Sequence, residues 1–374
     1  MRIEEPRRIA IFRALQLGDL LAAVPALRAI RRRFPEAEIS LIGLPWAAGF
    51  AQRFARYIDR FVEFPGYPGI DEAPFEAART ARFLEEQQSY GYDLAVQMHG
   101  SGQTSNPFVL ALHGRHTVGY YEGERPVGLT LAAEYPCEQH EILRNLGLAA
   151  LLDERRGGAG PCPIEDATLE FPLYGEDYAE AARLLALLPT GRRPWIGMHV
   201  GARPPARRWP LEHFAALADA LVRTFNAEVL LTGSADEKTM VHGVLERMET
   251  RAINLAGKTS LGGLAALMRK LDLFISNDTG PAHLAVAVDC PSVTIFGPAD
   301  PQRWAPLDRE RHPIVRREVA CSPCGYWQCP IDHRCLRWLS PEMVMDAAEG
   351  LLHEGVVARR GQDRLLNIPL YKEK

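Results

Sequence analysis

The sequence predicts an α/β protein made of two doubly wound, Rossmann-like domains in tandem. Residues 9–43 open the chain as strand, glycine-containing loop, helix and strand, which is how a doubly wound sheet begins. Residues 271–298 repeat the pattern in the second half. Between them, residues 154–163 (ERRGGAGPCP) are rich in glycine and proline, as interdomain linkers are. We therefore expect an N-terminal domain over residues 1–165, a C-terminal domain over 166–340, and a closing helix and tail over 341–374 that packs back on the N-terminal domain.

Composition excludes several classes of protein. With 374 residues, 47% of them hydrophobic and 24% charged, the chain has ordinary globular composition and enough length for two domains. The net charge of −4 gives no basic footprint for nucleic acid. We find no apolar run as long as a membrane span, and the N-terminus MRIEEPRRIAIF has no secretory signal. We expect a cytoplasmic protein that meets a membrane only at its surface.

The N-terminal half alternates short apolar strands with helices. We expect strands at residues 9–13, 39–43, 93–98 and 118–120, where turn-forming residues bound apolar runs. Helices are expected from Asp19 to about Phe34 and at residues 74–89 and 139–152. Asp19 follows the first strand, so it lies at the carboxyl end of the sheet. Taken alone, an aspartate at a helix start also suits a structural cap.

The C-terminal half begins a second winding. Expected strands are the apolar runs at residues 195–200, 228–232, 271–275 and 292–296. Helices are expected at residues 176–188, 211–225, 237–249, 261–270, 282–288 and 341–352. Ligands of open parallel sheets bind beyond the carboxyl ends of the strands, so the loops that follow these strands are the candidate binding segments.

The stretch LDLFISNDTGPAHLAVAVDCPSVTIFGP, residues 271–298, carries the most specific signal. Turn-forming residues 276–280 follow an apolar strand, and Pro281 is a residue type favoured in the first turn of a helix. Backbone N–H groups and the positive end of a helix then point at one place, which suits a diphosphate. An ordinary turn, with His283 as a core histidine, is the structural alternative for these residues.

Two strings in and after this stretch resemble a family signature. They are Asp-Thr-Gly-Pro-Ala-His-Leu at residues 278–284 and Pro-Ser-Val-Thr-Ile-Phe-Gly-Pro-Ala-Asp-Pro at residues 291–301. Together they resemble glycosyltransferase family 9, the ADP-heptose–lipopolysaccharide heptosyltransferases and their relatives. The resemblance covers essentially the whole chain. It implies a GT-B fold, in which two Rossmann-like domains face each other across a cleft.

The resemblance also implies a catalytic residue and a donor site. Asp19, in GDLLAAVPAL, matches the motif whose aspartate is the general base that takes a proton from the attacking sugar hydroxyl. Arg207, two positions before Trp-Pro, matches the basic residue on the donor phosphates, with Arg208 beside it. Arg203 is a departure, because relatives usually carry a small hydroxyl residue there. A solvated basic loop is the alternative for residues 199–210.

Further site residues follow from the same resemblance. Donor contacts are expected from Gly201, Ala202, Gly233, Glu237 on the ribose hydroxyls, Thr259 beside the base, and the turn Asp278, Thr279, Gly280, Pro281 and His283. Helix capping is the alternative for Glu237. Acceptor contacts are expected from Gln97, His99 and Ser101 by their place at the end of the strand at residues 93–98 and in the loop that leaves it, for which the family offers no transferable code. Because no Asp-X-Asp motif stands in a suitable position, a divalent cation need not hold the diphosphate.

Four cysteines form a separate cluster. Cys321, Cys324, Cys329 and Cys335 have the spacing C-x2-C-x4-C-x5-C. In a cytosolic protein this pattern favours a structural zinc or iron ion over disulfides. The spacing matches no common zinc module, so four reduced thiols remain the alternative.

These features predict an inverting, cation-independent glycosyltransferase that needs no catalytic cofactor. It would move heptose from ADP-heptose to a lipopolysaccharide inner-core acceptor, with peripheral contact at the cytoplasmic face of the inner membrane. Protein or secondary-metabolite acceptors are the nearest alternatives. A GT-B nucleotide-sugar epimerase and a non-catalytic nucleotide-sugar sensor are alternatives of other classes.

Overall fold

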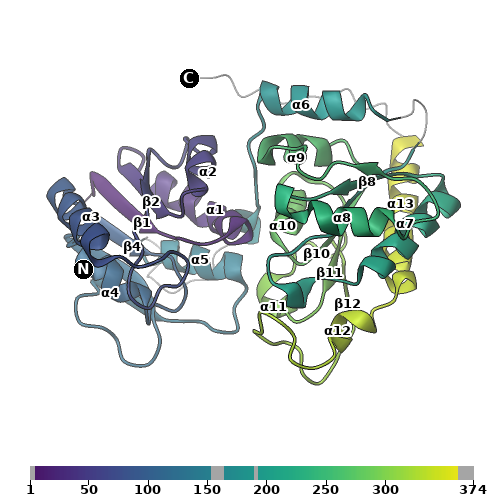
Figure 1. The fold of residues 1–374 in the computed structure, drawn as a ribbon. Helices are drawn as coiled ribbons and strands as arrows, with labels where there is room; N and C mark the ends of the chain where they lie inside the picture. The colour runs from purple at the N-terminus through teal and green to yellow at the C-terminus, as the bar shows by residue number, and fades with distance from the viewer. Residues whose placement is uncertain (1–4, 153–163, 189–192, 361–374) are drawn as a thin grey trace. The chain divides into compact units, whose positions relative to one another are not determined.

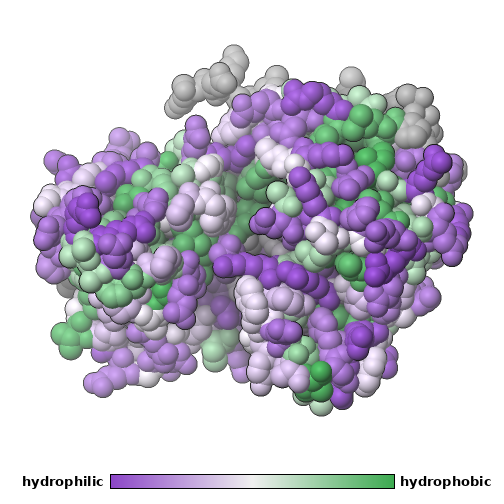
Figure 2. Space-filling view, in the orientation of Figure 1, coloured by the Kyte–Doolittle hydropathy of each residue, from purple (hydrophilic) through white to green (hydrophobic). Residues whose placement is uncertain are grey.

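Two units, Met1–Leu169 and Glu170–Lys374, make up the chain. The computed structural model describes residues 5–152, 164–188 and 193–360 (Figure 1). The expected linker at residues 154–163 lies outside the described residues. Hydrophilic side chains predominate on the face of each unit seen in Figure 2, as expected where helices pack one side on a sheet. Among the described residues, no helix combines the length and the apolar content needed to cross a membrane.

The first unit contains a six-stranded sheet in the order β3-β2-β1-β4-β5-β6, and every pairing is parallel. The strands are β1 (Arg8–Phe12), β2 (Glu38–Gly43), β3 (Arg60–Glu63), β4 (Leu94–Gln97), β5 (His116–Tyr121) and β6 (Leu131–Glu134). The helices are α1 (Leu17–Arg33), α2 (Ala47–Arg53), α3 (Ala77–Tyr90), α4 (Ser105–Ala111) and α5 (Glu141–Ala150). The direction of winding reverses between β1 and β4, and a ligand crevice belongs at such a point.

The second unit has the same sheet topology, with the strand order β12-β11-β10-β7-β8-β9, and all of its pairings are parallel. Its strands are β7 (Trp195–His199), β8 (Glu228–Thr232), β9 (Ile253–Asn254), β10 (Leu273–Asn277), β11 (Ser292–Phe296) and β12 (Ile314–Arg316). Its helices are α6 (Gly175–Leu185), α7 (Leu211–Phe225), α8 (Lys238–Leu245), α9 (Leu261–Met268), α10 (Gly280–Ala287), α11 (Pro301–Trp304), α12 (Arg334–Arg337) and α13 (Pro341–Arg360). Here the reversal falls between β7 and β10.

The C-terminal helix belongs to the core of the second unit. Val344, Ala348 and Leu352 of α13 are buried in the same apolar cluster as Trp209 and Phe214. α13 packs on α7 and on strands β10, β11 and β12. The expected return of this segment to the N-terminal domain stays a prediction.

The expected elements differ from the observed ones mainly at sheet edges. β3, β6, β9 and β12 were not expected, since edge strands of two to four residues are too short to show a strand pattern in the sequence. β10 begins at Leu273, two residues later than expected. The expected helix at residues 237–249 begins as a 3₁₀ turn at Ala235–Glu237 and continues as α8 to Leu245.

Candidate functional site

The reversal point of the second unit gathers the residues that follow β7 and β10. Asn277, the last residue of β10, is fully buried and joins the two loops. Its Nδ2 donates to the carbonyls of Val200 (2.9 Å) and Gly201 (3.1 Å), and its Oδ1 accepts from the backbone N–H of Trp209 (3.0 Å). From the sequence, Asn277 is only one of several turn residues. A buried amide at a strand end is the signal that marks it as an organiser of this site.

Arg207 and Asp278 form an ion pair at this point. Arg207 Nη1 lies 3.0 Å from Asp278 Oδ2, and the Asp278 side chain is 3% exposed while that of Arg207 is 33% exposed. Thr279 follows as the N-cap of α10 and makes no side-chain capping bond, with Gly280 and Pro281 in the first turn. A half-exposed guanidinium beside a helix N-terminus is suited to bind an anion.

The residues next to the Arg207–Asp278 ion pair are held by contacts of their own. Arg208 turns back on its own loop, and its Nε donates to the Ala202 carbonyl at 2.8 Å. Trp209 is buried, and its indole N–H donates to the Leu339 carbonyl at 2.9 Å. His283 is half-buried in α10 and meets the ring of Trp304 edge-on. Of the two adjacent arginines, Arg207 is therefore the one directed at the Asp278 turn.

Glu237 lies at the carboxyl end of β8, against the end of β7. Its Oε2 accepts from the backbone N–H of Ser234 at 2.7 Å and lies 3.5 Å from His199 Nε2. A Cβ at Gly201 would stand only 1.8 Å from Glu237 Oε1, so this glycine makes room for the carboxylate. Burial lowers the pKa of His199, while the charge of Glu237 opposes that shift. Glu237 thus caps its helix turn and also faces the crevice residue Gly201.

Thr259 lines an open pocket of about 440 Å³ in the same unit. The other lining residues are Glu180, Arg183, Leu184, Gly257, Lys258 and Ser260. Glu180 of α6 accepts from the backbone N–H and the hydroxyl of Ser260, both at 2.7 Å. These two bonds fasten α6 to the N-cap of α9. α6 and the loop at residues 257–260 form two sides of the pocket.

In the first unit, Asp19 is the third residue of α1 and is half-buried. Its Oδ2 accepts from the backbone N–H of Gln16 at 3.3 Å, which completes a capping box. Its carbonyl accepts from Nε of Arg13 at 2.9 Å. Arg13 is itself buried and paired with Glu141 at 3.1 Å. The sequence did not point to this buried ion pair, whose partners are 128 residues apart.

The expected acceptor residues have different settings. Gln97 is fully buried, and its Nε2 donates to the His99 carbonyl (2.6 Å) and to Ser105 Oγ (2.5 Å), so it shapes the loop after β4. The ring of His99 stacks on Phe12 and accepts from the backbone N–H of Ala14 at 3.2 Å. Ser101 is half-buried in the same loop. Acceptor binding by these residues stays a prediction.

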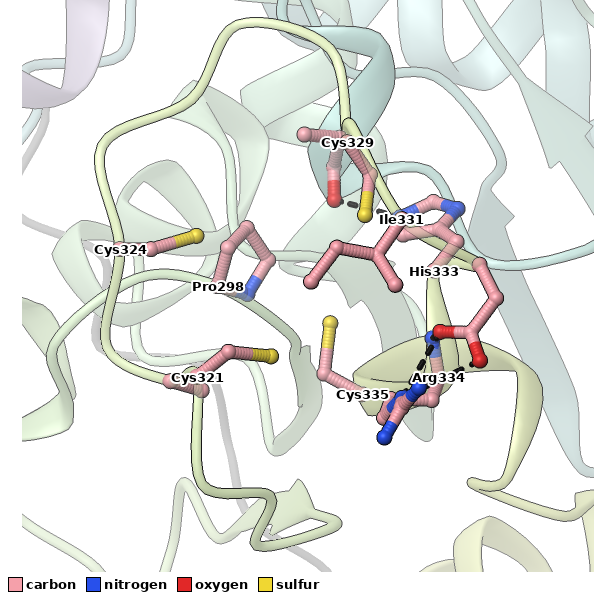
Figure 3. Close-up of a pocket in the computed structure, with 11 residues that line it drawn as sticks. Pro298, Cys321, Cys324, Cys329, Ile331, His333, Arg334 and Cys335 are labelled. Atoms are coloured by element: carbon pink, nitrogen blue, oxygen red, sulfur yellow. Dashed lines mark hydrogen bonds and ion pairs between the residues drawn. The ribbon is translucent and has the colours of Figure 1, made fainter.

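The four cysteines of the cluster line one small cavity (Figure 3). Its volume is about 20 Å³, room for one water-sized particle, and Pro298 and Ile331 lie beside the sulfur atoms. None of these cysteines is in a disulfide. In the part of the chain that the structure describes, no three His, Cys, Asp or Glu side chains are drawn together closely enough to hold a metal ion. The chemistry of the four thiols fits zinc or iron, but a bound ion would have to draw the sulfur atoms inward.

Comparisons with known proteins show which family and which fold this chain shares. The profile of glycosyltransferase family 9 (heptosyltransferase) matches residues 80–334. Lipooligosaccharide heptosyltransferase 2 of Campylobacter jejuni is 25% identical over 340 residues, which span 90% of this chain and 95% of that protein.

Solved structures show the same architecture. A family 9 glycosyl transferase from Veillonella parvula matches with a TM-score of 0.72 at 23% identity, over 95% of this chain and 99% of that one. ADP-heptose LPS heptosyltransferase II of E. coli matches with a TM-score of 0.70 at 21% identity, over 93% and 99% of the two chains. The expected GT-B fold is confirmed by these matches and by the two six-stranded parallel sheets.

Proposed function

Because this chain belongs to glycosyltransferase family 9 and is a glycosyltransferase, we propose that it moves a heptose from ADP-heptose to the inner core of lipopolysaccharide. The observation that carries the proposal is the Arg207–Asp278 pair at the N-terminus of α10. The pair holds the partly exposed Arg207 guanidinium beside the N-terminus of α10, where the winding of the second sheet reverses, and this placement suits the diphosphate of a nucleotide sugar. Residues 166–340 would hold the donor and residues 1–165 the acceptor.

The donor site is assigned residue by residue. Arg207 and the first turn of α10, from Thr279 to Pro281, would bind the diphosphate. Glu237 would accept hydrogen bonds from the ribose hydroxyls, in the space bordered by Gly201 and Gly233. The pocket that contains Thr259 would take the base. Arg208 and Ala202 keep the loop in shape through their mutual hydrogen bond.

The proposed reaction is a single displacement. The Asp19 carboxylate takes the proton from the acceptor hydroxyl while that oxygen forms a bond to the anomeric carbon. The bond from the same carbon to the donor phosphate breaks, and ADP leaves with the electron pair. Attack opposite to the leaving group inverts the anomeric configuration. Arg207 and the α10 N-terminus stabilise the negative charge that develops on the phosphate, so the reaction should proceed in the presence of EDTA.

The test is a transfer assay with the purified protein, ADP-heptose, and lipopolysaccharide from a strain that lacks the corresponding gene. We expect mass spectrometry to show one added heptose, NMR to show an inverted anomeric centre, and EDTA to leave the rate unchanged.

Transfer only to protein or to a secondary metabolite would replace the proposed acceptor. Release of nucleotide with an epimerised or unsaturated sugar, without acceptor, would mean an epimerase. ADP-heptose binding without turnover would mean a sensor. Contact with the inner membrane stays a prediction.

A further inference from the structure

We propose that the cysteine segment, residues 321–335, positions Arg207 for the donor diphosphate, with His333 as the positioning residue. The inference rests on the proposed function of Arg207. It gives the cysteine segment a task in donor binding, beyond any role as a metal site. All of the residues involved belong to the second unit.

The contact between the two segments is made at Ala206, the residue before Arg207. Ala206 is 2% exposed and lies in the 3₁₀ turn Pro205–Arg207. Its backbone N–H donates to the carbonyl of Trp327 at 3.1 Å. Its carbonyl lies 2.7 Å from Nε2 of His333. A carbonyl oxygen only accepts, so His333 donates this hydrogen bond. Both backbone polar groups of Ala206 are therefore satisfied by the cysteine segment.

The other side of the segment is fastened to the sheet. The backbone N–H of Cys324 donates to the Pro298 carbonyl at 2.7 Å, and the Ser322 hydroxyl donates to the Gly297 carbonyl at 2.9 Å. Gly297 and Pro298 directly follow β11. Ala206 itself lines the cavity that the four cysteines share. The segment thus bridges the end of β11 and the loop that carries Arg207.

These hydrogen bonds fix the backbone of the 3₁₀ turn, and so they fix the position from which the Arg207 side chain extends. The 3₁₀ turn is only three residues long, and its buried carbonyl at Ala206 would lose its partner without the His333 ring. The turn would then shift to find another donor, and the Arg207 guanidinium would leave its place beside Asp278. Misplacement of this kind weakens binding of the donor and not of the acceptor.

The experiment compares two amides at position 333. His333 has a positive φ of 59°, which asparagine tolerates better than most residues. In His333→Asn the amide is too short to reach the Ala206 carbonyl, whereas in His333→Gln the amide nitrogen reaches about as far as Nε2. The matched control is His242→Asn, the same change at an exposed histidine of α8. Arg207→Ala serves as the reference for a lost donor contact.

For His333→Asn we expect the Kd of ADP and the KM of ADP-heptose to rise about two- to tenfold, the effect of one hydrogen bond. The KM of the acceptor should not change. His333→Gln should restore the wild-type values to within about twofold, and His242→Asn should behave as wild type. Arg207→Ala should raise the Kd of ADP by about tenfold or more, because its bond is charge-assisted.

Unchanged ADP affinity in His333→Asn, with a clear loss in Arg207→Ala, would overturn the inference and leave the proposed donor site standing. Unchanged affinity in both variants would overturn the donor site and the inference together. Hydrogen exchange of the wild-type protein gives an independent test that needs no variant to fold. The Ala206 amide should be protected, and rapid exchange there would contradict the bridge.

Discussion

At the scale of single residues, Asp19 combines a structural contact with the proposed catalytic one. Its carboxylate accepts the backbone N–H of Gln16, and its backbone carbonyl is held by the buried Arg13. A carboxylate has enough acceptor sites for the cap and for an incoming hydroxyl. Asp19 can therefore cap the helix and act as a base at the same time. Only a substitution that keeps the cap and removes the base can distinguish the two roles.

Asp19→Asn separates them, because the asparagine oxygen still accepts from Gln16 while the amide takes up no proton. We expect kcat to fall by about 10²–10⁴-fold, with the Kd of ADP and the melting temperature nearly unchanged. Asp177→Asn is the matched control, since Asp177 completes the same capping box in α6 through the N–H of Tyr174 at 2.9 Å. Transfer by Asp19→Asn at close to the wild-type rate would leave Asp19 only its capping role.

At the scale of elements, the cysteine segment contains no strand and only the start of one helix, α12, and its four thiols give it a distinctive chemistry. We expect elemental analysis to find about one zinc or iron ion per chain, and chelation to lower the melting temperature before it affects catalysis. Cys324→Ser should lose the ion, while Cys137→Ser, at an exposed thiol outside the segment, should keep it. Protein purified under reducing conditions without any metal would show that the four thiols are simply reduced.

The elements that sequence predicted well are those with a local signal at both ends. α7 was expected over its full length, Leu211–Phe225, and the structure shows what bounds it: Pro210 precedes it and Asn226, with a left-handed backbone, follows it. β8 and β11 are buried along their whole length and read as apolar runs. β12 has only three residues at a sheet edge, so pairing with β11 defines it and local sequence does not.

In the candidate site, too, some features were expected from the sequence and others were not. Arg207 and Asp278 were each expected from their motifs, yet the ion pair joins residues 71 positions apart. The His333–Ala206 bond spans 127 positions, and no motif spacing encodes it. Gln97 was expected from its place at the end of a strand, but its amide is buried and donates to Ser105, which holds it within the protein. The motifs therefore proposed residues for the donor loop, and the hydrogen bonds and ion pairs that hold these residues come from the fold.

At the scale of the whole molecule, the second unit should lose stability in mild acid. Burial lowers the pKa of His312 to about 4, against the opposing charge of Asp308. The ring is neutral in the folded protein, and its Nδ1 lies 2.8 Å from the Ser292 hydroxyl. The unfolded chain takes up a proton below a pH of about 6.5, while the folded chain does not until about pH 4. The free energy of unfolding should therefore fall between these two pH values, by up to about 3 kcal/mol.

Tryptophan fluorescence can follow this transition, because the second unit holds Trp195, Trp209, Trp304, Trp327 and Trp338 and the first holds only Trp46. Urea unfolding of the wild type at pH 7 and pH 4.5 should show the loss. In His312→Asn, which cannot titrate but can still bond Ser292, the difference between the two pH values should be smaller. Equal differences in both proteins would assign the acid sensitivity to other groups.

The two sheets share one strand order, and each has its own apolar core and its own reversal point. The residues that we propose for the donor therefore all lie on a unit with a core of its own. If donor and acceptor bind as proposed, selection for a new glycan would act on the loops after β1 and β4, and the residues for the activated sugar could be inherited unchanged. Under the proposed function, two sheets with the same strand order would let related enzymes extend different polysaccharides from a single kind of donor.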